Sequence, residues 1–189
     1  MALFPIFIDI QGKNILIVGA GEVALRKIEK LLPFNPKITV VAKEIVREEI
    51  KHLSKENKIK IVERPFLFTD IDGKEIVIVA VDDINLQREI YNYCVRRKIP
   101  VNSVDSPDYC TFIFPAYVKK GDIVIGITTS GKAPGLSGKL RKLIESYLPD
   151  DLEKILEELI EIRNKLPKGE KRQEIIKKLV DEKLKKPPV

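Results

Sequence analysis

A glycine-rich turn between an apolar segment and an amphipathic one constrains the fold of this chain more than any other feature. Residues 14–18 (NILIV) are apolar and end at Gly19, after which apolar residues recur at helical spacing. The turn, Gly19-Ala-Gly21-Glu-Val-Ala24, has the GxGxxG/A pattern and lies directly between the predicted strand and the predicted helix. Gly19 permits a tight turn, Gly21 lets backbone amides approach a pyrophosphate, and the helix N-terminus near Glu22 adds partial positive charge. The pattern predicts a dinucleotide-binding βαβ unit, and a glycine-rich turn without a ligand is the alternative.

Apolar and amphipathic segments continue to alternate up to residue 102. Strands are predicted over residues 37–42, 59–63, 75–81 and 99–102, and helices over 44–57 and 83–98. Fully apolar strands separated by amphipathic helices are typical of a parallel sheet with crossover helices. Further along the chain, strands are predicted over 110–118 and 121–129, followed by a helix and by a charged helical region with a break at 166–169.

These segments predict an α/β fold. We expect a Rossmann-type parallel sheet, followed by a small α+β region and a helical C-terminal region. The expected boundaries are 1–109 for the dinucleotide-binding domain, 110–149 for the α+β region and 150–189 for the helical region.

Composition excludes several other classes of protein. The chain has 189 residues, of which 44% are hydrophobic and 33% charged, so it can bury a core inside a charged surface. Its apolar runs fall far short of the roughly 20 residues that span a bilayer. The start, MALFPIFIDI, lacks the basic region and the cleavage site of a signal peptide. We therefore expect a cytoplasmic protein with no membrane partner.

Two cysteines and one histidine provide little material for metal or disulfide chemistry. Cys94 and Cys110 form no CxxC pair, and His52 lies in a charged helical segment where we expect it at the surface. No metal site is therefore expected. The net charge of +6 is compatible with a nucleic-acid partner, but the chain has no basic block with interleaved aromatic residues, so none is expected. Such a charge suits a small polyanionic substrate equally well.

The ends of the second and fourth predicted strands bear on the cofactor. A ribose-binding carboxylate is expected where the second strand ends, and here the strand ends in Lys43 followed by Glu44. Either Glu44 fills this role one residue late or Lys43 favours a 2′-phosphate, so the residues leave NAD and NADP open. The fourth strand ends at Ala80, whose small side chain leaves room for the nicotinamide half. Asp82 and Asp83 either belong to that site or cap the next helix.

Asp105 follows the fifth predicted strand, where the carboxyl edge of the sheet meets the next region. Reactive groups of open α/β folds usually lie at this position. A carboxylate here can accept a proton, or hold a cation or a protonated ring nitrogen. The alternative is an aspartate in a loop ahead of Pro107 with no chemical role.

A third group of candidate residues precedes the helix predicted after residue 133. The segment from Thr128 to Gly135 combines hydroxyls, glycines and Lys132, which favours anion binding, although it does not match GxxxxGK[ST]. Basic residues are concentrated around this segment: Lys119, Lys120, Lys132, Lys139, Arg141 and Lys142. They predict either a binding strip for a carboxylate-rich ligand or a solvated helix face.

Five segments together resemble the precorrin-2 dehydrogenase family, which comprises the amino-terminal module of siroheme synthases and its free-standing relatives. They are, in order, PIFIDIQGKNILIVGAGEVALRK, ITVVA, AVDD, VNSVDSPDYCTFIFPA and TTSGKAPGLSGKLRKLIES. The resemblance covers roughly residues 3–149. It is specific, because Asp105 is followed by Phe112-Ile-Phe-Pro115 and then by Ser130-Gly131.

The resemblance implies NAD-dependent oxidation of precorrin-2 to sirohydrochlorin in siroheme and heme biosynthesis. It matches Gly19, Gly21, Glu22 and Val23 to the dinucleotide turn, Lys43 and Glu44 to the adenosine contact, Asp105 to the essential carboxylate and Ser130 to a pocket serine. It also implies a homodimer formed through residues 110–149, whose apolar faces cannot all be buried on a sheet already covered by its own helices. The family pattern differs at two positions, since Val81 replaces a frequent threonine and Lys43 is unusual.

Two other functions are compatible with the same residues. Some members of the family also insert ferrous iron into sirohydrochlorin, a step in which Asp105 would have to accept the pyrrole protons. A non-catalytic nucleotide-sensing Rossmann module would use the turn from Gly19 to Ala24 but leave Asp105, Ser130 and the basic strip without a role.

Overall fold

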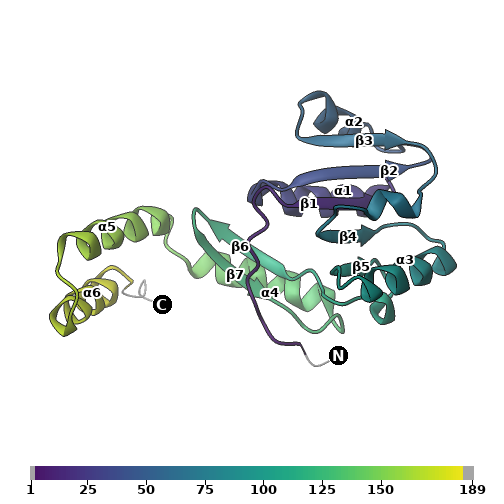
Figure 1. The fold of residues 1–189 in the computed structure, drawn as a ribbon. Helices are drawn as coiled ribbons and strands as arrows, with labels where there is room; N and C mark the ends of the chain where they lie inside the picture. Colours follow the sequence, from purple (N-terminus) through teal and green to yellow (C-terminus); the bar gives the residue numbers. More distant parts are fainter. Residues whose placement is uncertain (1–2, 185–189) are drawn as a thin grey trace. The chain divides into compact units, whose positions relative to one another are not determined.

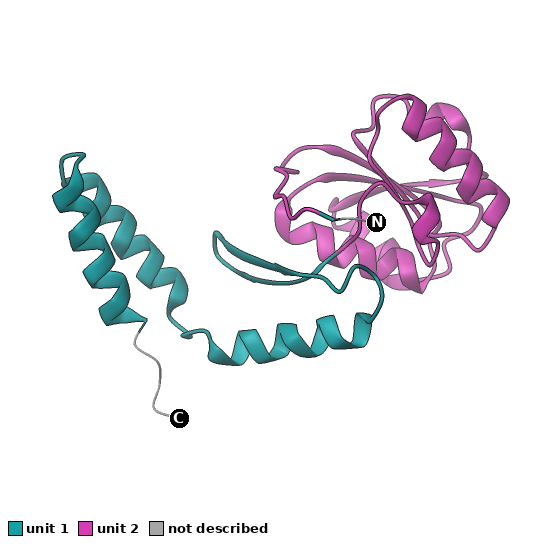
Figure 2. Ribbon diagram, turned by 90° about the horizontal axis from the view of Figure 1, so that it is seen from below, with its two compact units in different colours: residues 1–3, 115–189 teal, residues 4–114 magenta. Residues whose placement is uncertain are grey.

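The computed structural model describes residues 3–184. It divides them into two compact units: Phe4–Phe114, and a second unit that consists of Leu3 and the residues from Pro115 onward (Figure 2). The first unit contains a five-stranded parallel sheet in the order β3-β2-β1-β4-β5 (Figure 1). Its strands are β1 (Asn14–Val18), β2 (Lys37–Ala42), β3 (Ile59–Glu63), β4 (Ile76–Val79) and β5 (Val101–Ser103). Its helices are α1 (Glu22–Leu31), α2 (Glu48–Lys55) and α3 (Ile84–Arg96), with short 3-10 turns η1 (Leu32–Phe34), η2 (Phe68–Ile71) and η3 (Pro107–Tyr109). The Rossmann-type sheet predicted from the alternation is confirmed.

The central strand β1 supplies both hydrophobic cores of this unit. Ile15 and Ile17 pack with the buried residues of α1 and α2, whereas Leu16 and Val18 pack with those of α3. Successive side chains of a strand point to opposite faces of the sheet. A continuous apolar run is therefore what a strand covered by helices on both faces requires.

The strand order reverses beside β1, which pairs with β2 on one side and with β4 on the other. Chain connections leave the sheet in opposite directions at such a point, and a crevice opens at the carboxyl ends of the strands. The turn after β1 and the residues after β4 and β5 lie at this edge. The topology therefore brings the candidate residues of the first unit together at the carboxyl edge of the sheet.

The second unit begins with an antiparallel hairpin and ends with helices. Its elements are β6 (Ala116–Lys120), β7 (Ile123–Ile127), α4 (Pro134–Tyr147), α5 (Leu152–Lys165) and α6 (Glu170–Lys183). α4 packs on the hairpin and α5 packs on α6. The predicted break at 166–169 is confirmed between α5 and α6. Within residues 3–184, no helix is long and apolar enough to cross a membrane.

Two predicted elements differ from the structure by more than two residues at one end. The strand predicted over 110–118 was wrong at its start, because Cys110 bridges to Asn102 and the Thr111 amide donates to the carbonyl of Val101 at 2.8 Å. These bonds hold the segment beside β5, so the first unit extends to Phe114 rather than to residue 109. The predicted helix over 44–57 was too long, since α2 covers only Glu48–Lys55.

Candidate active site

The turn after β1 is held between the two neighbouring strands. The Gly19 amide donates to the carbonyl of Val41 at 2.8 Å, and the Ala80 amide donates to the carbonyl of Val18 at 2.7 Å. Gly19 has a φ of 107°, and a Cβ atom built on it would overlap the carbonyl oxygen of Ala80. Only glycine combines this dihedral angle with such a close approach. The turn therefore lies directly beside the end of β4, where Ala80 was predicted to leave room for the nicotinamide half.

Gly21 is the N-cap of α1 and faces open space. Its φ of −85° suits any residue, and no side chain caps the helix. An added Cβ atom would meet no other atom within 4 Å. The first amides of a helix lack internal partners and attract anions. This uncapped, open helix start fits the pyrophosphate of a dinucleotide.

The residues next to Gly21 differ in exposure. Glu22 is exposed and forms a 3.4 Å ion pair with Arg47, whereas Val23 is half-buried. Arg47 also pairs with Glu49 at 2.7 Å. Arg47 was not among the predicted site residues, because its position inside the predicted helix over 44–57 gave no signal of a contact with the turn.

The end of β2 presents two exposed charged residues, Lys43 and Glu44. The carbonyl of Val41, two residues before Lys43, accepts the hydrogen bond from the Gly19 amide, so Lys43 and Glu44 follow the strand that flanks the turn. This placement is the one at which a Rossmann protein contacts the adenosine ribose. With Arg47 on the same loop, the region contains two basic side chains and an exposed carboxylate.

The structure decides the role of Asp83. Its carboxylate accepts hydrogen bonds from the amides of Asn85 and Leu86, at 3.0 and 3.1 Å, so Asp83 is the N-cap of α3. Of the two roles left open for Asp82 and Asp83, capping is therefore the role of Asp83. Asp82 is exposed.

Asp105 lies one residue beyond the hydrogen bond that ties the end of β5 to β4. The Val104 amide donates to the carbonyl of Val79 at 2.9 Å, which brings Asp105 and Ala80 to the same edge of the sheet. Asp105 is exposed and has a φ of 59°, in the left-handed region that aspartate tolerates better than most residues. Non-glycine residues in this conformation cluster at functional sites.

The loop that carries Asp105 is clamped by Cys110. The Cys110 thiol donates to the carbonyl of Ser103 at 3.1 Å and lies 3.4 Å from that of Ser106. Burial raises the pKa of Cys110, so the thiol stays neutral near pH 8.

His52 is exposed, as predicted. Among residues 3–184, no group of three or more histidine, cysteine, aspartate or glutamate side chains could hold a metal ion.

Lys27 is a second charged residue of this region that the sequence analysis missed. Its ammonium lies 4.1 Å from the centroid of the Phe114 ring, and its side chain is half-buried. Burial lowers the pKa of Lys27 to about 8, and nearby Lys30 acts in the same direction. The available signal was its spacing, three residues after the buried Ala24, which indicates the inner face of α1.

Ser130 and Lys132 belong to the second unit, in the loop before α4. Both are exposed, and Ser130 has a φ of 56°. The neighbouring hydroxyls hold the loop itself: Thr128 Oγ1 accepts from the Ser130 amide at 3.0 Å, and Thr129 Oγ1 accepts from the Ala133 amide at 3.1 Å. Ser130 and Lys132 are therefore presented by a stiffened loop ahead of a helix start.

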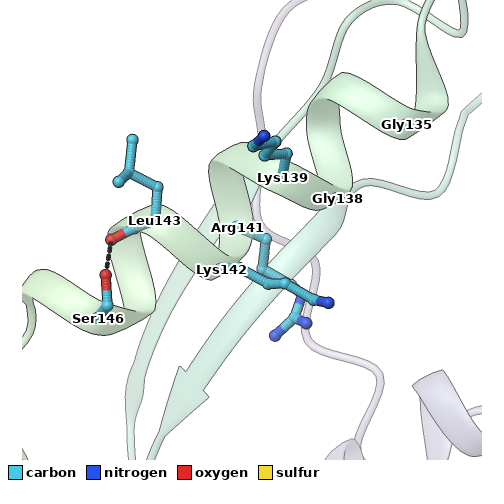
Figure 3. A pocket seen from close by; sticks show the side chains of 7 residues that line it. All are labelled: Gly135, Gly138, Lys139, Arg141, Lys142, Leu143 and Ser146. Atoms are coloured by element: carbon cyan, nitrogen blue, oxygen red, sulfur yellow. Dashed lines mark hydrogen bonds between the residues drawn. The ribbon is translucent and has the colours of Figure 1, made fainter.

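The predicted basic strip is partly engaged in contacts within the second unit. Lys119 donates to the carbonyl of Gly121, Lys120 to that of Pro149, and Arg141 pairs with Glu145 at 2.6 Å. A groove of about 660 Å³ along α4 is lined by Gly135, Gly138, Lys139, Arg141, Lys142, Leu143 and Ser146. In the view of Figure 3, Arg141 and Lys142 extend from one side of α4 and Lys139 from the other.

The sheet order, the glycine turn and the open start of α1 define an NAD(P)-binding protein of the Rossmann class. The chain belongs to the family described as "Putative NAD(P)-binding", whose model matches residues 6–116. This assignment agrees with the dinucleotide-binding unit predicted from the turn.

Curated relatives confirm the resemblance to siroheme synthases. The chain is 40% identical over 166 residues to a siroheme synthase of Ruthia magnifica subsp. Calyptogena magnifica, which covers 88% of this chain and 35% of the relative. It is also 40% identical over 157 residues to that of Vesicomyosocius okutanii subsp. Calyptogena okutanii (strain HA), covering 83% of this chain and 34% of the relative. The chain thus spans about a third of the length of these relatives.

A solved structure has the same fold. The protein described as SirC, precorrin-2 dehydrogenase, superposes with a TM-score of 0.75 over 96% of this chain and 92% of its own, at 22% sequence identity. The agreement over nearly the whole length includes the hairpin and the C-terminal helices as well as the sheet. It confirms the predicted order of a Rossmann-type sheet, a small α+β region and a helical region.

Proposed function

We propose that this chain oxidises precorrin-2 to sirohydrochlorin with NAD as the oxidant. The observation that carries the proposal is that Asp105 and Ala80 follow adjacent strands at the same edge of the sheet, the edge that also holds the glycine turn. A carboxylate next to the nicotinamide end of a dinucleotide site suits a dehydrogenation, in which the substrate loses a hydride and a proton. The 40% identity to siroheme synthases supports the choice of substrate.

NAD supplies the hydride acceptor when bound. Gly19 and Gly21 let the backbone approach the pyrophosphate, and the start of α1, with Glu22 and Val23, binds it through amides. Lys43 and Glu44 would contact the adenosine ribose. The residues of the first unit would thus hold the cofactor at the carboxyl edge of the sheet, where the small side chain of Ala80 leaves room for the nicotinamide half.

Asp105 accepts the proton that the substrate loses with the hydride, and releases it to water. An exposed carboxylate at the end of β5 is suited to this role because it can exchange its proton with solvent. Ser130 and Lys132 bind the substrate, since a hydroxyl and an ammonium are donors for its acetate and propionate groups. Residues 110–149, with the basic side chains of α4, form the substrate and dimerisation region.

The active enzyme is a homodimer that forms through the second unit. Leu136, Leu143 and Tyr147 are exposed by 53%, 50% and 70%, and their spacing of seven and four residues puts them on one face of α4. A second copy of the chain would cover this apolar face. A cytoplasmic location fits the two free thiols, Cys94 and Cys110, because the cytoplasm keeps thiols reduced.

An anaerobic assay tests the proposed activity. Purified protein is mixed with precorrin-2 and either NAD or NADP, and the absorbance of sirohydrochlorin and of the reduced cofactor is followed. Formation of both products in equal amounts with NAD supports the proposal. Tight NAD binding without oxidation of precorrin-2 would indicate a nucleotide-sensing module instead.

A further inference from the structure

Lys27 has no anionic partner in the part of the chain that the structure describes. Its ammonium group forms no hydrogen bond or ion pair with residues 3–184, and it lies 4.1 Å from the centroid of the Phe114 ring. An ammonium carries three hydrogen-bond donors and is costly to remove from water without acceptors. The aromatic face offsets only part of this cost. The position is thus suited to binding an anion from outside the chain.

The charged groups around Lys27 come from two elements. Arg26 and Lys30 share α1 with it, whereas Asp105 and Cys110 belong to the segment after β5. Asp105 favours the charged form of Lys27, but burial and the two cations outweigh it, and the pKa falls to about 8. The Cys110 thiol remains neutral at that pH because burial raises its pKa. An incoming carboxylate would therefore meet a cation that lacks a strong partner.

The surroundings of Lys27 also provide an aromatic surface. The rings of Phe112 and Phe114 lie 5.5 Å apart and are tilted by 49°. Asn102 holds this segment through a 2.9 Å hydrogen bond from its Nδ2 to the carbonyl of Phe112, while its own Oδ1 is buried without a partner among the described residues. Aromatic rings beside a cation suit a flat apolar ring system that carries acidic groups.

The pyrophosphate of the cofactor is not the anion that Lys27 would bind. Gly21 caps the start of α1, and Lys27 lies six residues further along the chain. At a rise of about 1.5 Å per residue, this is about 9 Å along the helix axis. The anion must therefore belong to the other ligand of the site.

We propose that Lys27 binds a carboxylate on the rim of the tetrapyrrole and so orients the macrocycle against Phe114 on the side of the site that carries Asp105. This inference rests on the proposed function, because it assigns Lys27 to the substrate of that reaction. It separates two roles: Lys27 anchors the substrate, and Asp105 handles the proton.

Three variants test this role: Lys27→Met, Lys27→Arg and, as a control, Arg26→Met. Arg26 is the exposed neighbour on the same helix, so its variant changes the net charge equally. Loss of one charge-assisted hydrogen bond corresponds to about a 10- to 100-fold change in an equilibrium constant. We expect Lys27→Met to raise the KM for precorrin-2 by at least tenfold at pH 7, with the Kd for NAD unchanged and kcat reduced far less than KM rises. Arg26→Met should leave the KM within twofold.

The pH profile adds a readout that a purely structural role would not move. In the wild type, the KM for precorrin-2 should rise as pH increases through about 8, where Lys27 loses its proton. Lys27→Arg should keep a low KM and lose this rise, because a guanidinium stays charged. An unchanged KM in Lys27→Met, an equal increase in Arg26→Met, or loss of NAD binding in Lys27→Met would overturn the inference.

A binding measurement separates this inference from the proposed function. Uroporphyrin, a flat and stable polycarboxylate, is titrated into the NAD-bound protein and its fluorescence is followed without turnover. If the wild type binds uroporphyrin through Lys27 but does not oxidise precorrin-2, the proposed activity fails and the anchoring role stands. If the wild type oxidises precorrin-2 and neither KM nor uroporphyrin affinity depends on Lys27, the anchoring role fails alone. If it neither binds uroporphyrin nor oxidises precorrin-2, both fail.

Discussion

The α-carbon of Gly19 lies so close to the carbonyl oxygen of Ala80 that no side chain fits between them. These two residues directly follow the adjacent parallel strands β1 and β4 and are 61 positions apart in the chain numbering. Their contact brings the dinucleotide turn to the end of β4, next to the loop that carries Asp105. The candidate active site of the first unit depends on this packing.

Gly19→Ala should destabilise the protein strongly. The substitution forces a Cβ atom into the carbonyl of Ala80 and an alanine into a φ of 107°, and strain of both kinds costs about 2–4 kcal/mol. Urea denaturation measures the free energy of unfolding. Gly12→Ala is the control, because Gly12 has a φ of 70° but no atom near its added Cβ, so about 1 kcal/mol is expected there. Equal losses at the two positions would show that the contact with Ala80 has no energetic weight.

Gly21→Asp should abolish dinucleotide binding without unfolding the protein. The backbone of Gly21 accepts any residue and the space beside it is open, so the fold should survive. A carboxylate at the start of α1 would occupy the position of the pyrophosphate and repel it. Calorimetric titration with NAD should show at least a 100-fold weaker Kd, with Gly21→Ala giving a smaller loss. Wild-type affinity in Gly21→Asp would mean that the turn does not contact the pyrophosphate.

Asp105→Asn should lower the turnover of precorrin-2 by a factor of about 10² to 10⁴, the usual effect of losing a general acid or base. Asparagine also tolerates the left-handed backbone, so thermal stability and the Kd for NAD should be kept. Asp108→Asn, at an exposed aspartate of η3, is the control and should keep full activity. Near wild-type turnover in Asp105→Asn would remove this residue from the chemistry and leave it a turn residue ahead of Pro107.

The stability of the wild type relative to Lys27→Met should depend on pH. The pKa of Lys27 is about 8 in the folded chain, against 10.5 for an ordinary lysine, so the folded state binds fewer protons between these values. The free energy of unfolding of the wild type therefore rises over this range. We compare the free energies of unfolding of the wild type and of Lys27→Met at pH 7 and at pH 10. The wild type should gain about 1 kcal/mol relative to the variant over this range, after allowance for solvent screening of a half-buried group. A difference that does not change with pH would show that Lys27 is fully hydrated.

Leu143→Glu should convert a dimer into a monomer. Leu143 belongs to the exposed apolar face of α4, and a carboxylate there would be buried by a second copy of the chain. Analytical ultracentrifugation at micromolar concentration should give a dimer for the wild type and a monomer for the variant. Val95→Glu, at an apolar residue of α3 exposed by 43%, is the control and should remain a dimer. A monomeric wild type would contradict the proposed assembly.

The sequence by itself was sufficient for the sheet and for the dinucleotide turn. Both follow from local sequence patterns. The apolar run from Ile15 to Val18 requires helices on both faces of the sheet, and Gly19 and Gly21 lie between the end of β1 and the start of α1. The exposure of His52 and the break between α5 and α6 also followed from neighbouring residues. Such features depend on the spacing of apolar residues along the chain and on backbone sterics, and neighbouring residues determine both.

Only the tertiary structure decided how the residues at the sheet edge divide their roles. Asp83 is a helix cap, Cys110 returns to β5 instead of starting a strand, and Lys27 meets Phe114 across a long separation in sequence. Each outcome depends on a contact between two segments of the chain. Hydrophobic periodicity predicts which face of the sheet a segment covers, but it does not predict which residues of two segments meet. The sequence does not show that the Lys27 ammonium is covered by the Phe114 ring or that no acceptor is near it. Burial and pairing depend on how the chain packs, so only the tertiary structure reveals them.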